Sequence, residues 1–266
     1  MKNNSKITIV LTSIAAGVLA ASLSTAGVGN VSNTNHNFSL GGVSPQNKSS
    51  VINQVCVFCH TPHNAGPKGP LWNKASSTAV ITYKFYSSST LSSVANAAAL
   101  TNNSPSLLCL GCHDGKTAMN VLHSSGTGSD ASLDGYPAGS RYAEGNLPIT
   151  MSGPVLDIWG DALGPSYNLG RAADGTNDTQ GDNLADDHPI GFSYDSAQQL
   201  KPAALITIGL VDSRIRFSGA LKKVECTTCH DPHVDTSNQP GGNTALKPFL
   251  VMSNSGSGLC LSCHIK

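Results

Sequence analysis

The eight cysteines of this 266-residue chain all lie in four copies of one pentapeptide, Cys-x-x-Cys-His. The copies begin at Cys56, Cys109, Cys226 and Cys260, and no cysteine is left over. Two thiols on one helical turn can add to the two vinyl groups of a haem, and the histidine that follows can then bind the iron. Zinc sites, disulfides and dithiol redox motifs need no histidine after each cysteine pair. The pattern therefore predicts four covalently bound haem c groups.

The predicted attachment and proximal residues follow directly from the motifs. The cysteines expected to form thioether bonds are Cys56, Cys59, Cys109, Cys112, Cys226, Cys229, Cys260 and Cys263. The histidines expected to bind iron on the proximal side are His60, His113, His230 and His264. Nothing in this set predicts a catalytic residue.

An internal duplication supplies four more histidines as candidate distal ligands. Each half has one histidine upstream of its first motif, His36 or His188, and one in an x-Pro-His extension of that motif, His63 or His233. In each half a second motif opening Leu-Cys-Leu follows. Eight histidines then match the eight axial positions of four haems, and His123 is the remainder.

The two x-Pro-His histidines lie three residues after a proximal histidine. His63 follows His60, and His233 follows His230. An imidazole on that short segment cannot reach the far side of its own haem, so each is expected to bind the iron of a different haem. The alternative is a polar loop histidine that hydrogen-bonds a haem propionate. For the two upstream histidines, and more so for His123, the alternative is an ordinary loop residue.

Other residues in the chain are weaker candidates for ligands. Asp186 and Asp187 are expected to orient the ring of His188 through its second nitrogen. Calcium is a minor alternative for an aspartate-rich loop whose spacing does not match an EF-hand, formed by Asp174, Asp178, Asp182, Asp186 and Asp187. The methionines Met119, Met151 and Met252 are interpreted as packing residues because histidines suffice for every site.

The first 26 residues have the pattern of a secretory signal peptide. Lys2 and Lys6 precede an uncharged apolar run, and small residues end at Ala26. A retained membrane anchor is the alternative, and no cysteine near the cleavage site offers a lipid anchor. The predicted mature chain is 27–266, with no further stretch that could span a bilayer. The expected location is outside the cell or at its surface, with the periplasm as the alternative.

Composition favours a fold with little regular structure. Only 5% of residues are aromatic and 12% are charged, so the apolar faces of four haems are expected to replace much of an ordinary core. We expect a mostly irregular chain with a few short α-helices and little β-structure around covalent haems. The predicted organisation is a first two-haem half at 27–125, a Gly/Asp/Asn-rich insert at 126–185 and a second two-haem half at 186–266. Without Lys2 and Lys6 the chain has 14 basic and 16 acidic residues, which does not suggest a nucleic-acid partner.

Four segments, 31–64, 105–116, 186–195 and 224–264, resemble the doubled Cys-x-x-Cys-His multihaem cytochromes. The four-haem count, the N-terminal histidine arm and the leader are similar to those of the outer-surface cytochromes of metal-reducing bacteria, including tetrahaem members that polymerise into conductive filaments. The resemblance implies bis-histidine haems in alternating parallel and T-shaped pairs, and an axial histidine donated across the subunit interface. His36, in its polar N-terminal arm, is the residue that suits such an exchange. His123 departs from the pattern and leaves one ligand assignment open.

The resulting hypothesis is an electron carrier and not an enzyme. Four low-spin haems would pass electrons to other redox proteins and extracellular acceptors, and the protein would self-associate into filaments for extracellular electron transfer. The first alternative is a soluble periplasmic tetrahaem shuttle. The second is a multihaem reductase, which requires an iron with an open axial position and hence a missing histidine.

Overall fold

A computed structural model describes two large parts of the chain, 83–113 and 183–266, and several shorter ones. The shorter parts are residues 30–43, 48–49, 53–62, 65, 69 and 71–73, with the backbone of 121–122 and 147–148. The predicted leader, His63, His123 and nearly all of the insert at 126–185 lie outside the described residues, as do Met119, Met151 and the first three aspartates of the candidate calcium loop.

The helices in the described residues are short. The α-helices are α1 (Ser93–Asn96), α2 (Ser106–His113), α3 (Tyr194–Leu200), α4 (Cys226–Cys229) and α5 (Gly258–Leu261). The 3₁₀ turns are η1 (Val31–Asn33), η2 (Cys56–Phe58), η4 (Ile208–Leu210), η5 (Thr244–Leu246) and η6 (Ser255–Ser257).

The strands form three pairs of two residues each. β1 (Lys84–Phe85) runs parallel to β4 (Asn183–Leu184), β2 (Val121–Leu122) antiparallel to β3 (Leu147–Pro148), and β5 (Phe192–Ser193) antiparallel to β6 (Lys223–Val224). The prediction of a mostly irregular chain with a few short helices and little sheet is confirmed for the described residues.

Local sequence explains where two of these helices begin and where one of them ends. The hydroxyl of Ser92 accepts the Ala95 N–H at 3.2 Å at the start of α1. At the start of α3, the hydroxyl of Ser193 accepts the Ser196 N–H at 3.3 Å. Serine is a preferred N-cap because its oxygen satisfies an otherwise unpaired N–H. Pro202 lies just beyond the end of α3 and cannot continue it.

The apolar residues are divided among small clusters. The largest joins α1, α3 and the β5–β6 pair through Ala95, Phe192, Tyr194, Ala197 and Val224. A second joins β1, α2 and β4 through Tyr83, Leu110 and Leu184. A third consists of Val57 and Phe58 within the first motif. Each cluster includes residues of one attachment motif: the first motif in the cluster of Val57, the second in that of Leu110 and the fourth, through Cys263, in the largest.

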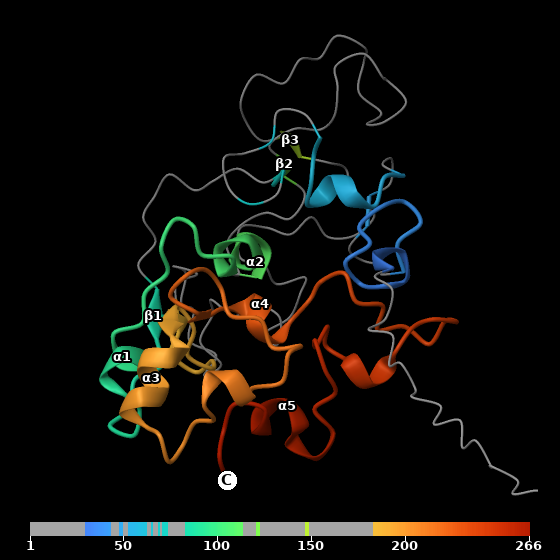
Figure 1. The fold of residues 1–266 in the computed structure, drawn as a ribbon. Coiled ribbons are helices and arrows are strands. Elements are labelled where there is room, and N and C mark those ends of the chain that lie inside the picture. Colours follow the sequence, from blue (N-terminus) through green and yellow to red (C-terminus); the bar gives the residue numbers. More distant parts are fainter. Residues whose placement is uncertain are drawn as a thin grey trace, which may run out of the picture.

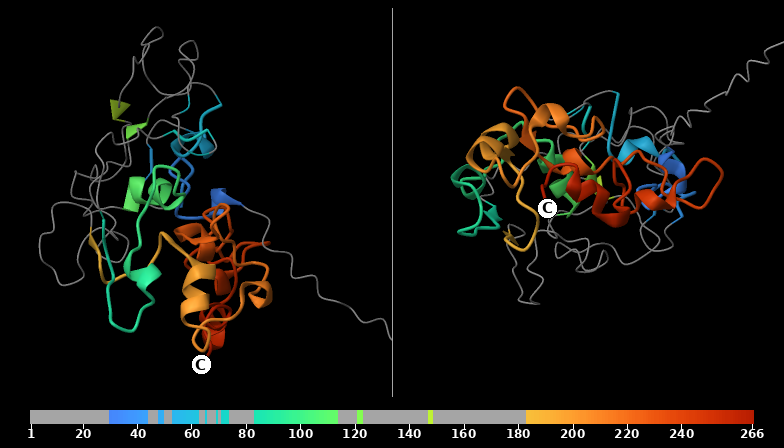
Figure 2. Two further views of the ribbon diagram at one scale, coloured as in Figure 1. Left: turned by 60° about the vertical axis from the view of Figure 1, so that its left-hand side comes forward. Right: turned by 60° about the horizontal axis from the view of Figure 1, so that its bottom comes forward.

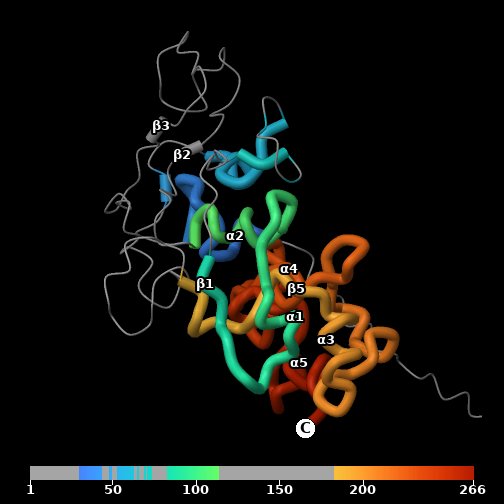
Figure 3. Tube along the Cα trace, turned by 90° about the vertical axis from the view of Figure 1, so that its left-hand side faces the viewer, coloured from blue at the N-terminus to red at the C-terminus, as the bar shows by residue number. Residues whose placement is uncertain are grey.

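The two halves of the chain pack against each other. In Figures 1 and 2 the second half, orange to red, gathers around the C-terminus, and the first half, blue to green, lies beside it. Contacts between α1 and α3 and between α2 and α4 join the halves, and Figure 3 shows these helices from another side. No helix in the described part of the chain is long and apolar enough to cross a membrane.

The C-terminal motif is held by a short antiparallel contact with residues 204–206. Ile206 N–H donates to the Cys263 carbonyl at 2.8 Å, and Ile265 N–H donates to Ala204 at 2.9 Å. The buried Tyr194 hydroxyl lies 2.7 Å from the Ile206 carbonyl and 3.1 Å from the Cys263 carbonyl. Because burial removes it from water, the pKa of Tyr194 is raised. The phenol therefore stays a donor that anchors the end of the chain.

Candidate functional site

Each of the four Cys-x-x-Cys-His motifs forms a helical turn, in η2, α2, α4 and α5. Cys109 and His113 of the second motif both lie within α2. In the other three motifs the histidine N–H donates to the carbonyl of the first cysteine: His60 to Cys56 at 2.7 Å, His230 to Cys226 at 3.0 Å and His264 to Cys260 at 2.9 Å. All eight cysteines are free. Each pair of thiols therefore lies within one turn, followed by its histidine, which is the arrangement expected from the spacing.

Three of the motif histidines each lie opposite one histidine from outside the motifs. The ring centroids are 6.1 Å apart for His113 and His36, 6.2 Å for His60 and His233, and 6.2 Å for His264 and His188. The ring planes are inclined by 72°, 17° and 74°, respectively. Every pair thus combines a predicted proximal ligand with a predicted distal one, at nearly the same separation.

That separation fits one metal ion between two imidazoles. A metal–nitrogen bond of roughly 2.0 Å and about 1.1 Å from nitrogen to ring centre, counted on both sides, place the centroids about 6 Å apart. The inclination of the planes is free, because each ring can rotate about its metal–nitrogen bond. The centroid separations of all three pairs therefore match the distance expected for two imidazoles on one iron.

His36 lies between the second motif and the segment after the third. Its ring stacks on Phe249, with centroids 4.3 Å apart and planes inclined by 16°. Burial, and next the nearby His113, lower the pKa of His36 to about 4. The Pro232 carbonyl acts in the opposite direction and raises that pKa, and the buried Nδ1 of His36 has no hydrogen-bond partner. A neutral imidazole is the form that binds metals.

Three other histidines have an oxygen acceptor at Nδ1. The acceptors are the Pro248 carbonyl for His230 at 2.8 Å, the Pro189 carbonyl for His188 at 2.9 Å and Asp231 Oδ1 for His233 at 2.9 Å. We assign the proton to Nδ1 in each, which leaves the Nε2 lone pair for a metal. Metal-binding histidines are usually oriented by such contacts.

The orientation of His188 differs from the expectation. Asp186 and Asp187 are the residues expected to hold its ring, but Nδ1 pairs with the carbonyl of Pro189. The Oδ2 atom of Asp187 is buried without a hydrogen bond, and burial raises the pKa of this carboxyl to about 6. The backbone can take this role because Pro189 follows the histidine directly, so its carbonyl is already near the ring.

The segment that follows the third motif forms a short antiparallel contact with it. Asp231 N–H donates to the Phe249 carbonyl at 2.8 Å, and Val251 N–H donates to Cys229 at 2.9 Å. Phe249 has a positive φ of 61°, and the preceding Pro248 supplies the acceptor for His230. This turn therefore supports both a proximal histidine and, through the Phe249 ring, the distal candidate His36.

The first motif also forms a short antiparallel contact with the segment that follows it. Thr61 N–H donates to the Leu71 carbonyl at 2.9 Å, Asn73 N–H donates to Cys59 at 2.8 Å, and Leu71 has a positive φ of 55°. The duplication therefore extends further than the histidines and motifs show. Sequence reasoning missed it because the segment lies 11 residues after His60 but 19 after His230. The sequence signal that could have revealed the repeat is the proline that precedes each of the two positive-φ residues, Leu71 and Phe249.

The longer loop in the second half holds the arm that carries His36. Asn33 Nδ2 donates to Asp235 Oδ2 at 3.0 Å across 202 positions, and Asp235 is 1% exposed. Asp235 Oδ1 accepts the Ser237 N–H at 2.9 Å. Farther along the arm the chain turns tightly, since a Cβ at Gly42 would lie 2.1 Å from the Asn37 carbonyl oxygen. The arm is thus attached to the second half at a defined point.

We expect Asn33→Asp to destabilise the protein by about 1–3 kcal/mol, because it opposes two carboxylates in a partly buried contact. Adding Asp235→Asn should restore most of the loss, since its amide can donate to the carboxylate introduced at position 33 while its oxygen still accepts the Ser237 N–H. Thermal unfolding of the wild type and both variants measures the effect. A double variant no more stable than Asn33→Asp would show that this contact does not hold the arm.

The second, third and fourth motifs lie close to one another. The thiols of Cys109 and Cys226 interact, which raises the pKa of Cys109 and lowers that of Cys226. Burial, and next the nearby Cys263, raise the pKa of Cys229 to about 11. Groups attached to these cysteines would therefore be neighbours.

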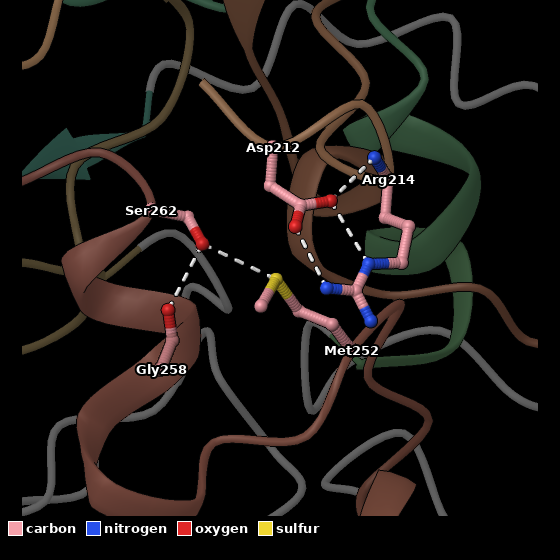
Figure 4. Close-up of polar contacts among 5 residues, drawn as sticks. All are labelled: Asp212, Arg214, Met252, Gly258 and Ser262. Carbon is pink, nitrogen blue, oxygen red and sulfur yellow. Dashed lines mark hydrogen bonds and ion pairs between the residues drawn. The ribbon is translucent and has the colours of Figure 1, made fainter. Parts of the chain in front are cut away.

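Met252 packs under the fourth motif, in agreement with its interpretation as a packing residue. It is buried, and its Sδ lies 3.3 Å from the hydroxyl of Ser262, which also lies 2.9 Å from the Gly258 carbonyl oxygen (Figure 4). The same view shows Arg214 donating to both carboxylate oxygens of Asp212, at 2.9 and 2.7 Å. These hydrogen bonds lower the pKa of Asp212 to about 2.

Within the described residues, no three or more His, Cys, Asp or Glu side chains converge as ligands of a metal ion. Neither a protein-family model nor a curated protein sequence matches this chain. The candidate site is therefore defined by its four motifs and the three histidine pairs.

Proposed function

We propose that this protein is a tetrahaem c-type cytochrome that carries electrons. The observation that supports it most is the pairing of three motif histidines with three other histidines at 6.1–6.2 Å. The motif alone predicts attachment and one axial ligand. A second imidazole at a metal-bridging distance from each of His60, His113 and His264 adds the other ligand.

We extend the pairing within the repeat to the remaining haem. The upstream histidine of each half faces the second motif of the same half, as His36 faces His113 and His188 faces His264. The x-Pro-His residue His233 faces the first motif of the other half. By the same rule His63, which lies outside the described residues, would bind the haem held at His230.

In this arrangement the protein's own residues attach, orient and enclose four redox groups. Each cysteine pair would form two thioether bonds to one haem, which supplies one-electron iron chemistry when bound. Two histidines would occupy both axial positions and exclude other ligands. Carbonyl and carboxylate oxygens at Nδ1 keep His188, His230 and His233 in the tautomer that binds iron.

The same pairing favours a carrier over a reductase. An enzyme of this class needs an iron whose sixth position is open to substrate, and each of the three pairs provides both imidazoles. The finer proposal is a secreted protein that polymerises into a filament for extracellular electron transfer. The alternative is a soluble periplasmic shuttle with the same ligands, and negative-stain microscopy of the purified protein distinguishes the two.

We expect all four haems to be six-coordinate and low-spin. The purified protein should carry four haems by mass, show no high-spin signal in ferric absorption or magnetic resonance spectra, and bind little carbon monoxide when reduced. A chain without covalent haem would exclude a cytochrome. A high-spin haem in the intact assembly would instead favour the reductase.

A further inference from the structure

A buried polar contact links the second and third motifs apart from the histidine pairs. Ser106 lies three residues before Cys109 on α2, and Glu225 directly precedes Cys226 at the start of α4. The exposed fractions of Ser106 and Glu225 are 0% and 1%. Residues three apart on a helix share a face, so Ser106 and Cys109 point to the same side of α2.

One hydroxyl joins the two motifs. Ser106 Oγ donates to Glu225 Oε2 and accepts the Cys226 N–H at 2.9 Å. The backbone of Glu225 is fixed as well, because its N–H donates to Thr228 Oγ1 at 2.9 Å. The carboxylate is therefore held at the place where the two attachment helices meet.

Glu225 brings a negative charge into this buried contact as well as a hydrogen-bond acceptor. None of the ion pairs among the described residues includes Glu225. Burying a carboxylate without a cation costs free energy, and uncharged serine, threonine or asparagine would serve better as a helix N-cap. A purely structural link between the helices would not need a negative charge.

We propose that Glu225 is a potential-setting residue for the two haems held by the second and third motifs, with Ser106 positioning its carboxylate. The inference rests on the proposed function. A fixed negative charge favours ferric over ferrous iron because the ferric haem is more positive, and it therefore lowers the midpoint potential. Since the charge is buried, salt screens it less than it screens a surface carboxylate.

Glu225→Gln tests the charge while preserving the hydrogen bond, because the amide oxygen can still accept from Ser106. Spectroelectrochemical titration of the haem-loaded protein should show two of the four midpoint potentials shifted upward and two nearly unchanged, with all four haems still low-spin. Glu225→Asp retains the charge and should stay closer to wild type. The matched control is Asp212→Asn, which removes an equal charge from the exposed pair with Arg214 and should shift none of the four potentials.

Glu225→Ser provides a second neutral variant, and it should produce the same upward shift even if Glu225→Gln does not accumulate. Four unchanged potentials in a neutral variant with four low-spin haems would overturn the role of Glu225 and leave the proposed function intact. An equal shift of all four midpoint potentials would also overturn the role of Glu225, since the effect would not be local to the second and third motifs. A wild-type protein without covalent haem would overturn the proposed function itself.

Discussion

His233→Ala should leave one high-spin haem in each chain, and that haem should be the one attached to the first motif. The ring of His233 lies 6.2 Å from that of His60, across a sequence separation that spans both halves. Removing the imidazole vacates one axial position, so one carbon monoxide should bind per reduced chain. Ferric absorption spectra and carbon monoxide titration count the vacated sites.

Deleting individual haems identifies which iron His233 serves. In a Cys56→Ser/Cys59→Ser background, which lacks the first haem, adding His233→Ala should leave the other three haems low-spin. In a Cys260→Ser/Cys263→Ser background, the same substitution should still create one high-spin haem. The reverse result would assign His233 to another haem. His123→Ala serves as the histidine control and should leave all four haems low-spin.

His36→Ala should yield soluble monomers with one vacant axial site each. Within one chain the ring of His36 faces His113 at 6.1 Å and stacks on Phe249 at 4.3 Å, so the haem at the second motif should lose its distal ligand. If neighbouring copies exchange this arm, each subunit still has eight ligands, and the exchange would join one chain's iron to the next chain's imidazole. Negative-stain microscopy and spin-state counting of the same sample measure assembly and ligation separately.

The two measurements separate the two roles of the arm. If His36→Ala gives soluble monomers with one high-spin haem, His36 serves both iron ligation and assembly. If the variant still forms filaments but has one high-spin haem, His36 serves ligation alone. Filaments in which all four haems stay low-spin would contradict both roles. Asn33→Asp is a useful companion, since it weakens the attachment of the arm to Asp235 while leaving the imidazole in place. The structure describes one chain, so the exchange between subunits stays a prediction.

Local spacing was enough to predict that each motif forms a single turn, while the haem attachment itself stays a prediction. Each motif spans five residues, and a single helical turn brings its two cysteines and histidine together whatever surrounds it. Composition was likewise enough to predict an irregular chain, because only 5% of the residues are aromatic and glycine, proline, serine and asparagine are abundant. The candidate distal ligands also followed from the sequence, through the repeated order of His36, His188 and His233 around the motifs.

The choice of partners was decided by tertiary structure. His233 lies 173 residues from His60, and Ser106 lies 119 residues from Glu225. No local pattern encodes such contacts, because they depend on how α2 and α4 bring the two halves together. The turn at Phe249 was not predicted, because the loop that leads to it from His230 is eight residues longer than the loop from His60 to Leu71 in the first half. The spacing of residues within one helical turn predicts contacts inside that turn. Contacts such as His60 with His233 depend instead on packing between segments that are far apart in the sequence.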